Sequence, residues 1–204
     1  DAGDCREDFN LGRLNITWTE GYQKNSDGTP KLNARDNLVY DHLYSYGSRS
    51  VSIWTENAKQ NGLDLVWDSG DHFEQHIAKN HPEIFNFNHE EAGLDNRSDN
   101  KGPEPEGVTV GKIGEKTFAF IGLERVGGVM VYDVSTPTKP IFVQYINSRE
   151  FKADTNAIEA GLAGDLGPEG LVFITAKDSP NGQPLLVVGN EVSGSTAIYQ
   201  VTLK

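Results

Sequence analysis

The chain contains an internal repeat, which is the feature that most restricts what it can fold into. Residues 118–134 (FAFIGLERVGGVMVYDV) align without a gap with residues 185–201 (LLVVGNEVSGSTAIYQV), at a constant offset of 67. Upstream of each segment the same tripeptide occurs, as Pro105-Glu106-Gly107 before the first and Pro168-Glu169-Gly170 before the second. A repeat of this length predicts one small structural unit that is built at least twice.

Five of the aligned positions are identical, and most of the others exchange one apolar residue for another. The identical pairs are Gly122 with Gly189, Glu124 with Glu191, Gly127 with Gly194, Tyr132 with Tyr199, and Val134 with Val201. Matched glycines in otherwise diverged segments indicate tight turns. We therefore expect one of the two glycine pairs, Gly122 and Gly189 or Gly127 and Gly194, to adopt backbone angles closed to other residues.

The strand candidates are short, rich in β-branched and aromatic residues, and separated by Gly, Pro, Asn or Asp. Residues 102–146 predict four sequential antiparallel strands, and residues 166–203 predict three. A weaker copy of the pattern predicts four more strands in residues 9–70, namely RLNITW, DHLYSYG, SVSIW and LDLVW. One segment differs, because Asp71 and Glu74 have the spacing of a capping box and Pro82 follows. It predicts a short helix within a polar insertion at residues 71–101.

The predicted fold class is all-β, because antiparallel units that recur every 60 to 70 residues are typical of β-propeller blades. The units are residues 9–70, 102–150 and 165–203, and the last lacks its outer strand. Closed propellers typically use about four to eight blades. We therefore expect residues 1–204 to be the C-terminal part of a propeller domain, with missing upstream blades of the same protein as its first partner. The alternative is a stack or sandwich of three sheets.

The composition is acidic, with 30 Asp and Glu against 18 Lys and Arg and a net charge of −12. This excess disfavours a nucleic-acid partner and an anionic membrane surface, and it suits either cation binding or simple solubility. No apolar run reaches the roughly eighteen residues of a transmembrane segment. The single cysteine, Cys5, can close no disulfide within the chain. No glycine-rich phosphate loop is present, so no nucleotide cofactor is predicted.

Long phrases of the chain resemble one protein family. YSYGSRSVSIW, DNRSDNKGPEPEGVTVG, TFAFIGLERVGGVMVYDVSTPTKPIFVQYINSREF and LLVVGNEVSGSTAIYQV are similar to the choice-of-anchor I family, and the resemblance covers nearly all of residues 9–203. These are secreted bacterial β-propeller proteins, often labelled alkaline-phosphatase-like or esterase-like. The resemblance implies an extracytoplasmic location, whether secreted, periplasmic or at the cell surface. It brings no set of catalytic residues to transfer.

Four glutamates form the main candidate metal site. Glu106 and Glu169 would begin the first strands of their units, and Glu124 and Glu191 would follow the second strands, which return to the same edge. We therefore expect all four carboxylates to face one opening. Clustered carboxylates need a cation or basic groups to neutralise them, and calcium is a hard ion that carboxylate oxygens suit. The alternatives are that the glutamates bind backbone amides of neighbouring units, or that they contact an organic ligand.

Other candidates carry weaker signals. Asp95 and Asp99, in DNRSDNKG, loosely resemble a calcium loop but lack the spacing and terminal glutamate of an EF-hand, so an ordinary polar loop is the alternative. His72 and His76 stand four residues apart on the predicted helix without an HExxH motif, which favours solvated histidines over zinc ligands. No GxSxG elbow or Ser-His-Asp spacing is present, and no catalytic residue is predicted.

Two functions from different classes follow. The first is an extracytoplasmic, non-catalytic propeller module that binds an ion, a glycan or a protein. The second is a calcium-dependent phosphoesterase, phytase-like or alkaline-phosphatase-like, in which the four glutamates hold the metal and a phosphorylated ligand bridges to it. A phosphate site usually contains basic side chains, and the sequence offers only Arg125, Lys101 and Lys177 near the glutamates. This scarcity favours the first function.

Overall fold

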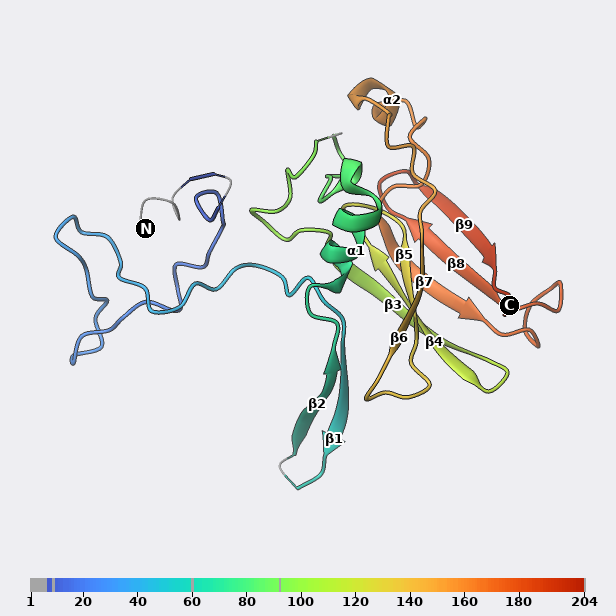
Figure 1. Cartoon of the computed structure of the whole chain (residues 1–204), viewed down its shortest axis with the longest axis horizontal. Helices are drawn as coiled ribbons and strands as arrows, with labels where there is room; N and C mark the ends of the chain where they lie inside the picture. The colour runs from blue at the N-terminus through green and yellow to red at the C-terminus, as the bar shows by residue number, and fades with distance from the viewer. Residues whose placement is uncertain (1–6, 9, 60, 92, 204) are drawn as a thin grey trace. The chain divides into compact units, whose positions relative to one another are not determined.

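The computed structural model describes residues 7–8, 10–59, 61–91 and 93–203, and Cys5 lies outside these ranges. Within them the fold is all-β, with three antiparallel sheets and two short α-helices (Figure 1). The strands are β1 (Ser52–Asn57), β2 (Gly62–Asp68), β3 (Pro105–Ile113), β4 (Lys116–Leu123), β5 (Val129–Asp133), β6 (Ile141–Ile146), β7 (Pro168–Ile174), β8 (Leu185–Asn190) and β9 (Ser195–Gln200). The helices are α1 (His72–Asn80), α2 (Thr155–Glu159) and a 3-10 helix at Pro82–Ile84. None of the described helices is long and apolar enough to cross a membrane.

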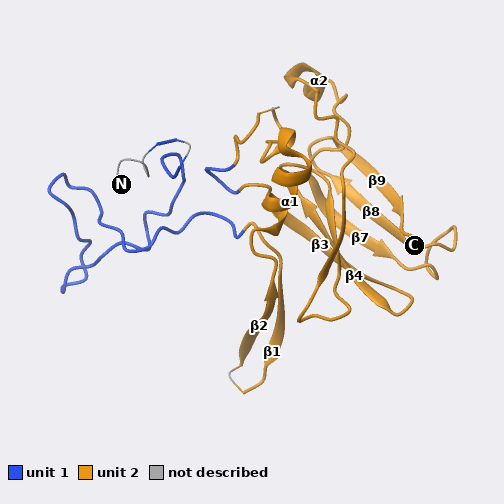
Figure 2. Ribbon diagram, viewed as in Figure 1, with its two compact units in different colours: residues 1–48, 98–101 blue, residues 49–97, 102–204 orange. Residues whose placement is uncertain are grey.

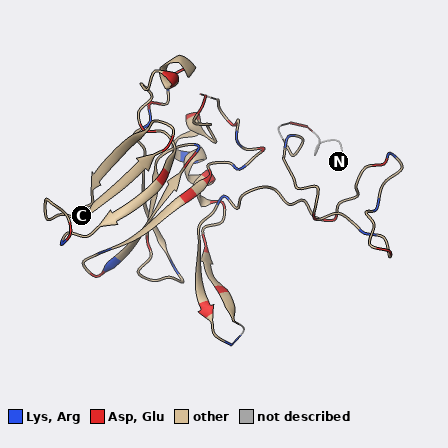
Figure 3. Ribbon diagram, turned by 180° about the vertical axis from the view of Figure 1, so that it is seen from behind, with Lys and Arg blue, Asp and Glu red and all other residues tan. Residues whose placement is uncertain are grey.

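The chain divides into two compact units (Figure 2). Unit 1 comprises residues 1–48 and 98–101, and unit 2 comprises residues 49–97 and 102–204. In its described residues, unit 1 contains isolated antiparallel bridges, such as Ile16 with Ser45 and Tyr22 with Tyr40. The three sheets and both α-helices belong to unit 2. Acidic and basic residues are spread over both units (Figure 3).

The predicted four-stranded unit at residues 9–70 is wrong. The described residues of this range form a two-stranded sheet of β1 and β2, and the segments at 13–18 and 41–47 meet in one isolated bridge. Their large apolar side chains remain exposed, including Trp18 (73%) and Tyr44 (53%). Alternation alone therefore does not build a sheet here, since none of the described residues forms a layer that buries these side chains.

The two larger sheets match the prediction. β3–β6 form one sheet in sequential antiparallel order, and β7–β9 form a three-stranded sheet in the same order. Gly127 and Gly194 have φ angles of 89° and 64°, which confirms the predicted steric need at one of the two matched glycine pairs. Gly122 and Gly189 do not adopt positive φ.

Helix α1 forms where it was predicted and ends before Pro82. The predicted capping box is wrong, because the side chain of Asp71 accepts no backbone N–H bond at the helix start. Glu74 instead accepts hydrogen bonds from Arg49 Nη1 at 2.9 Å and from Asn86 Nδ2 at 2.7 Å. Contacts with other parts of unit 2 therefore take the place of the local cap.

Two apolar layers hold unit 2 together. In the first, Phe73 and Ile77 of α1 are buried with Ile121, Met130 and Tyr132 on one face of the β3–β6 sheet. The second layer lies between the opposite face and the β7–β9 sheet. Its buried members are Phe118, Phe120, Val129, Val131, Leu186 and Val188. Successive residues of β4 and β5 thus alternate between the layers, as the two-residue period of a strand requires.

The two larger sheets approach each other between β3 and β7. Gly107 and Gly111 face β7, and a Cβ there would collide with the carbonyl oxygen of Glu169 and with the ring of Phe173, respectively. The Phe173 ring stacks on Phe120, with ring centroids 5.7 Å apart. Glycine allows this close approach, which brings the first Pro-Glu-Gly tripeptide beside its copy.

Candidate functional site

Matched β-bulges lie at the two Pro-Glu-Gly tripeptides. The register of β3 against β4 shifts between Pro105 and Val108, and that of β7 against β8 shifts between Pro168 and Gly170. In both cases the first strand carries one extra residue within the tripeptide. A bulge bends its strand and re-aims a side chain, and bulges are common beside functional sites. The repeated tripeptide therefore coincides with a repeated backbone irregularity.

The turns after the second strands return to the edge where the first strands begin. The backbone N–H of Glu124 donates to the carbonyl oxygen of Glu104 at 2.8 Å, and that of Glu191 donates to the carbonyl oxygen of Gly167 at 2.7 Å. These bonds occupy equivalent places in the two repeats. Each sheet therefore has its two predicted glutamates at one edge.

In the β3–β6 sheet the carboxylates converge. One ligand oxygen from each of Glu104, Glu106 and Glu124 lies within 4.8 Å of the other two. Glu106 is exposed, whereas Glu104 and Glu124 are buried. Glu104 was missed from the sequence because its counterpart in the second repeat is Gly167, so the repeat did not single it out. Its presence beside Pro105 in an acidic stretch was the available signal.

In the β7–β9 sheet, Glu169 and Glu191 are both exposed. A hydrogen bond between their side chains raises the pKa of Glu169, and the charges of Glu191 and, more weakly, Glu106 act in the same direction. The charge of Glu106 also helps to raise the pKa of Glu124. Glu106 therefore links the two sheets electrostatically. We refer to Glu104, Glu106, Glu124, Glu169 and Glu191 together as the glutamate rim.

Basic side chains lie beside the buried half of the rim. Glu104 Oε1 pairs with Arg97 Nη2 and lies 3.2 Å from Arg125 Nε, while Arg125 Nη2 lies 3.3 Å from Glu124 Oε1. Arg125 follows Glu124 directly in the sequence, so its position near the glutamates could be predicted. Arg97 lies in the polar insertion at residues 71–101, and it reaches Glu104 because of the path of that loop. The guanidinium groups of Arg97 and Arg125 thus partly neutralise the buried carboxylates.

Glu124 has a pKa raised to about 7. Burial is the main cause and a hydrogen bond with Glu104 is the next, while Arg125 opposes them. His89 Nδ1 lies 3.5 Å from Glu124 Oε1, and the pKa of this buried imidazole is lowered by burial first and by the charge of Arg125 second. Burial therefore favours the neutral form of both the His89 imidazole and the Glu124 carboxyl group.

Arg149 lies behind the buried half of the rim. Its Nη1 donates to the carbonyl oxygen of Arg125 at 3.1 Å, and its Nη2 donates to that of Asn88 at 2.7 Å. The guanidinium also lies over the rings of Phe87 and Phe151. Burial lowers the pKa of Arg149 to about 10, so the side chain stays charged at neutral pH. These contacts hold the loops around the rim in place. The sequence contains no motif that predicts them.

The weaker candidates Asp95 and Asp99 fall in different units. The N–H of Asp95 donates to the carbonyl oxygen of Phe85 at 2.9 Å, and Asp99 Oδ1 lies 3.9 Å from Arg13 Nη1. Within the part of the chain that the structure describes, neither joins a group of three converging metal-ligand side chains. The rim is therefore a better candidate metal site than the loop that contains Asp95 and Asp99.

Two known proteins are related to this chain. It is 29% identical over 204 residues to Gigasin-3a of Magallana gigas, an alignment that covers 96% of this chain and 66% of that protein. It is 25% identical over 177 residues to the mesenchyme-specific cell surface glycoprotein of Strongylocentrotus purpuratus, covering 82% of this chain and 23% of that protein. The chain thus spans less than two thirds of the length of each relative. No solved structure matches it.

The family can be assigned from the sequence as a whole. Residues 2–137, two thirds of the chain, match the Choice-of-anchor I domain. This match confirms the resemblance carried by the quoted phrases. Both relatives are metazoan proteins, whereas the resemblance implied a bacterial one. The chain belongs to the choice-of-anchor I family.

Proposed function

We propose that this chain is an extracytoplasmic binding module whose glutamate rim binds a divalent cation, with calcium as the first candidate. The observation that supports the proposal is the pair of matched bulges at the two Pro-Glu-Gly tripeptides, each of which contains an exposed glutamate. Family membership supports the location, as does the name of the S. purpuratus relative, a mesenchyme-specific cell surface glycoprotein. A bound cation would in turn present open coordination positions to a glycan or protein partner.

The exposed half of the rim needs a cation more than the buried half does. Among the described residues, no Lys, Arg or His forms an ion pair with Glu106, Glu169 or Glu191. Two carboxylates that hydrogen-bond to each other require a shared proton or a bound cation. Calcium takes about six to eight oxygen ligands, which carboxylates, backbone carbonyls and water can supply.

We also propose that the two larger sheets are adjacent blades of a β-propeller. Their strands lie within residues 102–150 and 165–203, share one order and one bulge position, and pack face to face. In such an arrangement the first strands line the central axis, and the rim lies at one mouth of the channel. The remaining blades would come from further chain, and both relatives are longer than this one.

A calcium-dependent phosphoesterase is the second candidate function, and one observation favours it. Arg97, Arg125 and Arg149 lie beside the rim, so basic groups are closer than the sequence indicated. Their guanidinium groups already bind Glu104 and backbone carbonyls, which places this function second. Hydrolysis of p-nitrophenyl phosphate or phytate that requires calcium, and that Glu106→Gln abolishes, would establish it.

Thermal unfolding of the full chain tests the cation site. Millimolar calcium should raise the melting temperature relative to EDTA, because a ligand bound only by the folded state stabilises that state. Glu169→Gln and Glu191→Gln should reduce the shift. Glu115→Gln is the matched control, since Glu115 is an exposed carboxylate in the turn at the other end of β3. An unchanged melting temperature in calcium, or an equal shift in all three variants, would contradict the proposal.

A further inference from the structure

Three histidines lie in a row where α1 meets β6. His72 and His76 stand four residues apart on the helix, and His81 caps its C-terminal end. The ring centroids of His72 and His76 are 5.9 Å apart, and those of His76 and His81 are 6.2 Å apart. All three residues are partly buried. We refer to these three side chains as the histidine row, with His76 at its centre.

Aromatic side chains of β6 pack against the histidine row. The ring centroid of Phe142 lies 5.1 Å from that of His72 and 4.6 Å from that of His76. The ring of Tyr145 lies 6.1 Å from that of His76 and 5.6 Å from that of His81. The sequence favoured solvated histidines at this place, whereas each ring has an aromatic neighbour that limits its movement. Side chains that are held in this way lose less entropy when they bind an ion.

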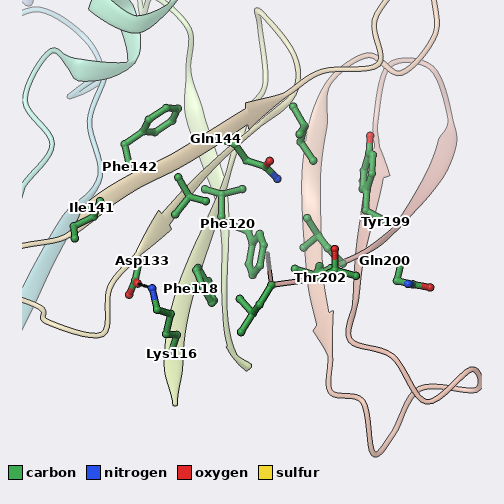
Figure 4. Close-up of a pocket in the computed structure, with 16 residues that line it drawn as sticks. Lys116, Phe118, Phe120, Asp133, Ile141, Phe142, Gln144, Tyr199, Gln200 and Thr202 are labelled. Atoms are coloured by element: carbon green, nitrogen blue, oxygen red, sulfur yellow. Dashed lines mark hydrogen bonds and ion pairs between the residues drawn. The ribbon is translucent and has the colours of Figure 1, made fainter. Parts of the chain in front are cut away.

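Phe142 belongs to the face of its sheet that α1 covers. It packs against the layer that contains Phe73 of α1, whereas Phe118 and Phe120 belong to the layer on the opposite face. Figure 4, a close-up of the groove beside β6, shows the Phe142 ring pointing away from the rings of Phe118 and Phe120. The histidine row and that groove therefore lie on different sides of β6.

The first histidine has the second partner that metal ligands commonly have. His72 Nδ1 lies 2.5 Å from the hydroxyl oxygen of Tyr132. The hydroxyl can accept a hydrogen bond from Nδ1, and this tautomer leaves the lone pair of Nε2 for an ion. Among the described residues, none forms a hydrogen bond with Nε2 of His72 or of His76. The hydroxyl of Tyr132 thus orients the ring without occupying its second nitrogen.

The protonation state of the row also suits a metal. Burial is the main cause that lowers the pKa of both His72 and His76 from 6.5. At the second histidine, the charges of His72, His81 and Lys79 act in the same direction. The charge of Asp71 opposes the shift at His72. Imidazole binds a metal ion only in its neutral form, which these shifts favour at neutral pH.

The class of ion follows from the donor atoms. Two histidines four residues apart on a helix lie on the same face, and imidazole nitrogen suits zinc, copper and nickel, whereas calcium takes oxygen ligands. A tetrahedral zinc ion with Zn–N bonds of about 2.0–2.1 Å would hold two imidazole centroids roughly 5 Å apart. The centroids of His72 and His76 lie 5.9 Å apart, so small side-chain rotations close the pair on one ion.

We propose that His72 and His76 chelate one transition-metal ion of the zinc, copper and nickel class, with water in the remaining coordination positions. Tyr132 is a positioning residue for His72. Among the described residues, His81 does not join the other two in a group of three converging ligand atoms, so the site is a two-histidine chelate. Its nitrogen donors select a different class of ion from the glutamate rim, and it does not depend on the proposed function.

Zinc titration of the full chain tests the site. Isothermal titration calorimetry in excess calcium, which occupies the rim, should show one zinc ion bound per chain. His72→Gln and His76→Gln should each weaken zinc binding about tenfold or more. His81→Gln should bind zinc as wild type does. His42→Gln is the matched control, because His42 is an exposed histidine of unit 1 and lies beside the ring of Tyr44. Circular dichroism checks that each variant is folded.

Copper(II) provides a second measurement that needs no variant. Electron paramagnetic resonance of the wild-type chain with one equivalent of copper should show hyperfine coupling to two imidazole nitrogens. His76→Gln should lose one of them. Zinc should also raise the melting temperature of the wild-type chain, because the ion is held by the folded state, and it should leave that of His76→Gln unchanged.

Three results would overturn the proposal. The first is no zinc or copper binding at millimolar concentration, and the second is equal zinc binding by wild type and His76→Gln. The third is a copper signal from oxygen donors alone, which would assign the ion to carboxylates. A loss of binding in His81→Gln instead of His72→Gln would contradict the assigned pair. The calcium shift of the melting temperature should persist in the histidine variants, so failure at one site is distinguishable from failure at the other.

Discussion

At the scale of single residues, one edge of a sheet holds carboxylates in two different states. Glu104 and Glu124 are buried beside Arg97 and Arg125, whereas Glu106 is exposed at the bulge. Burial makes the ionised form of a carboxyl group costly, and nearby arginines reduce that cost. Glu124 is therefore sensitive to pH, and the exposed Glu106 is free to act on a ligand.

Replacing Glu124 with Gln should change how stability depends on pH. The pKa of Glu124 rises from 4.5 to about 7 on folding, so the folded state binds more protons between these values. Its stabilising contribution is full below about pH 4.5 and is lost as the pH rises through 7. The melting temperature of Glu124→Gln relative to wild type should therefore be higher at pH 8 than at pH 5, by about 2–4 °C or more. Thermal unfolding in EDTA measures it, and an equal difference at both pH values would contradict the raised pKa.

At the scale of elements, the close approach of β3 to β7 depends on glycine. A Cβ at Gly107 would collide with backbone of the neighbouring strand, which cannot rotate away as a side chain could. Its counterpart in the repeat, Gly170, has nothing within 4 Å of the Cβ position and no positive φ. The two equivalent glycines thus have different packing roles.

Gly107→Ala and Gly170→Ala form a matched pair that tests this difference. Gly107→Ala should lower the free energy of unfolding by roughly 1–3 kcal/mol, the usual cost of overpacking. Gly170→Ala should be neutral or slightly stabilising, because alanine loses less backbone entropy on folding. Urea unfolding of both variants checks the prediction. Equal effects would show that β3 and β7 do not approach as closely as described.

The histidines of α1 predict a second pH effect. His72 Nδ1 lies 2.5 Å from Tyr132 Oη, and the His76 ring lies 4.6 Å from that of Phe142. Burial is the main cause that lowers both histidine pKa values from 6.5. The unfolded chain then binds more protons below this pH, so stability falls as the pH drops through 6.5. The double variant His72→Gln/His76→Gln should lose less stability than wild type between pH 7.5 and pH 5.

The elements that could be predicted from the sequence are those marked by a pattern within a few neighbouring residues. Alternating apolar residues and repeated turn glycines located β3–β9, and sequential antiparallel order placed Glu106 with Glu124 and Glu169 with Glu191. The same alternation failed at residues 13–18 and 41–47, because it does not reveal whether a second layer will cover a strand. Long-range partners of the rim, Arg97 and His89, were also missed, since the path of the insertion at residues 71–101 brings them there.

At the scale of the whole molecule, two copies of one repeat build a single acidic edge. Each copy alone supplies one bulge and one returning turn, and the glycine contact between β3 and β7 brings the copies together. In repeat proteins the stacking of neighbouring units creates extended binding surfaces. Cation binding by the rim is the central claim that follows from this arrangement.

The most direct test is a crystal structure of the full chain grown with calcium, with the ion located by its anomalous signal. The account predicts one ion at the rim, with oxygens of Glu106 and of Glu169 or Glu191 at about 2.3–2.6 Å. A rim that stays free of calcium at millimolar concentration, or glutamates of the two sheets that lie on different edges, would contradict it.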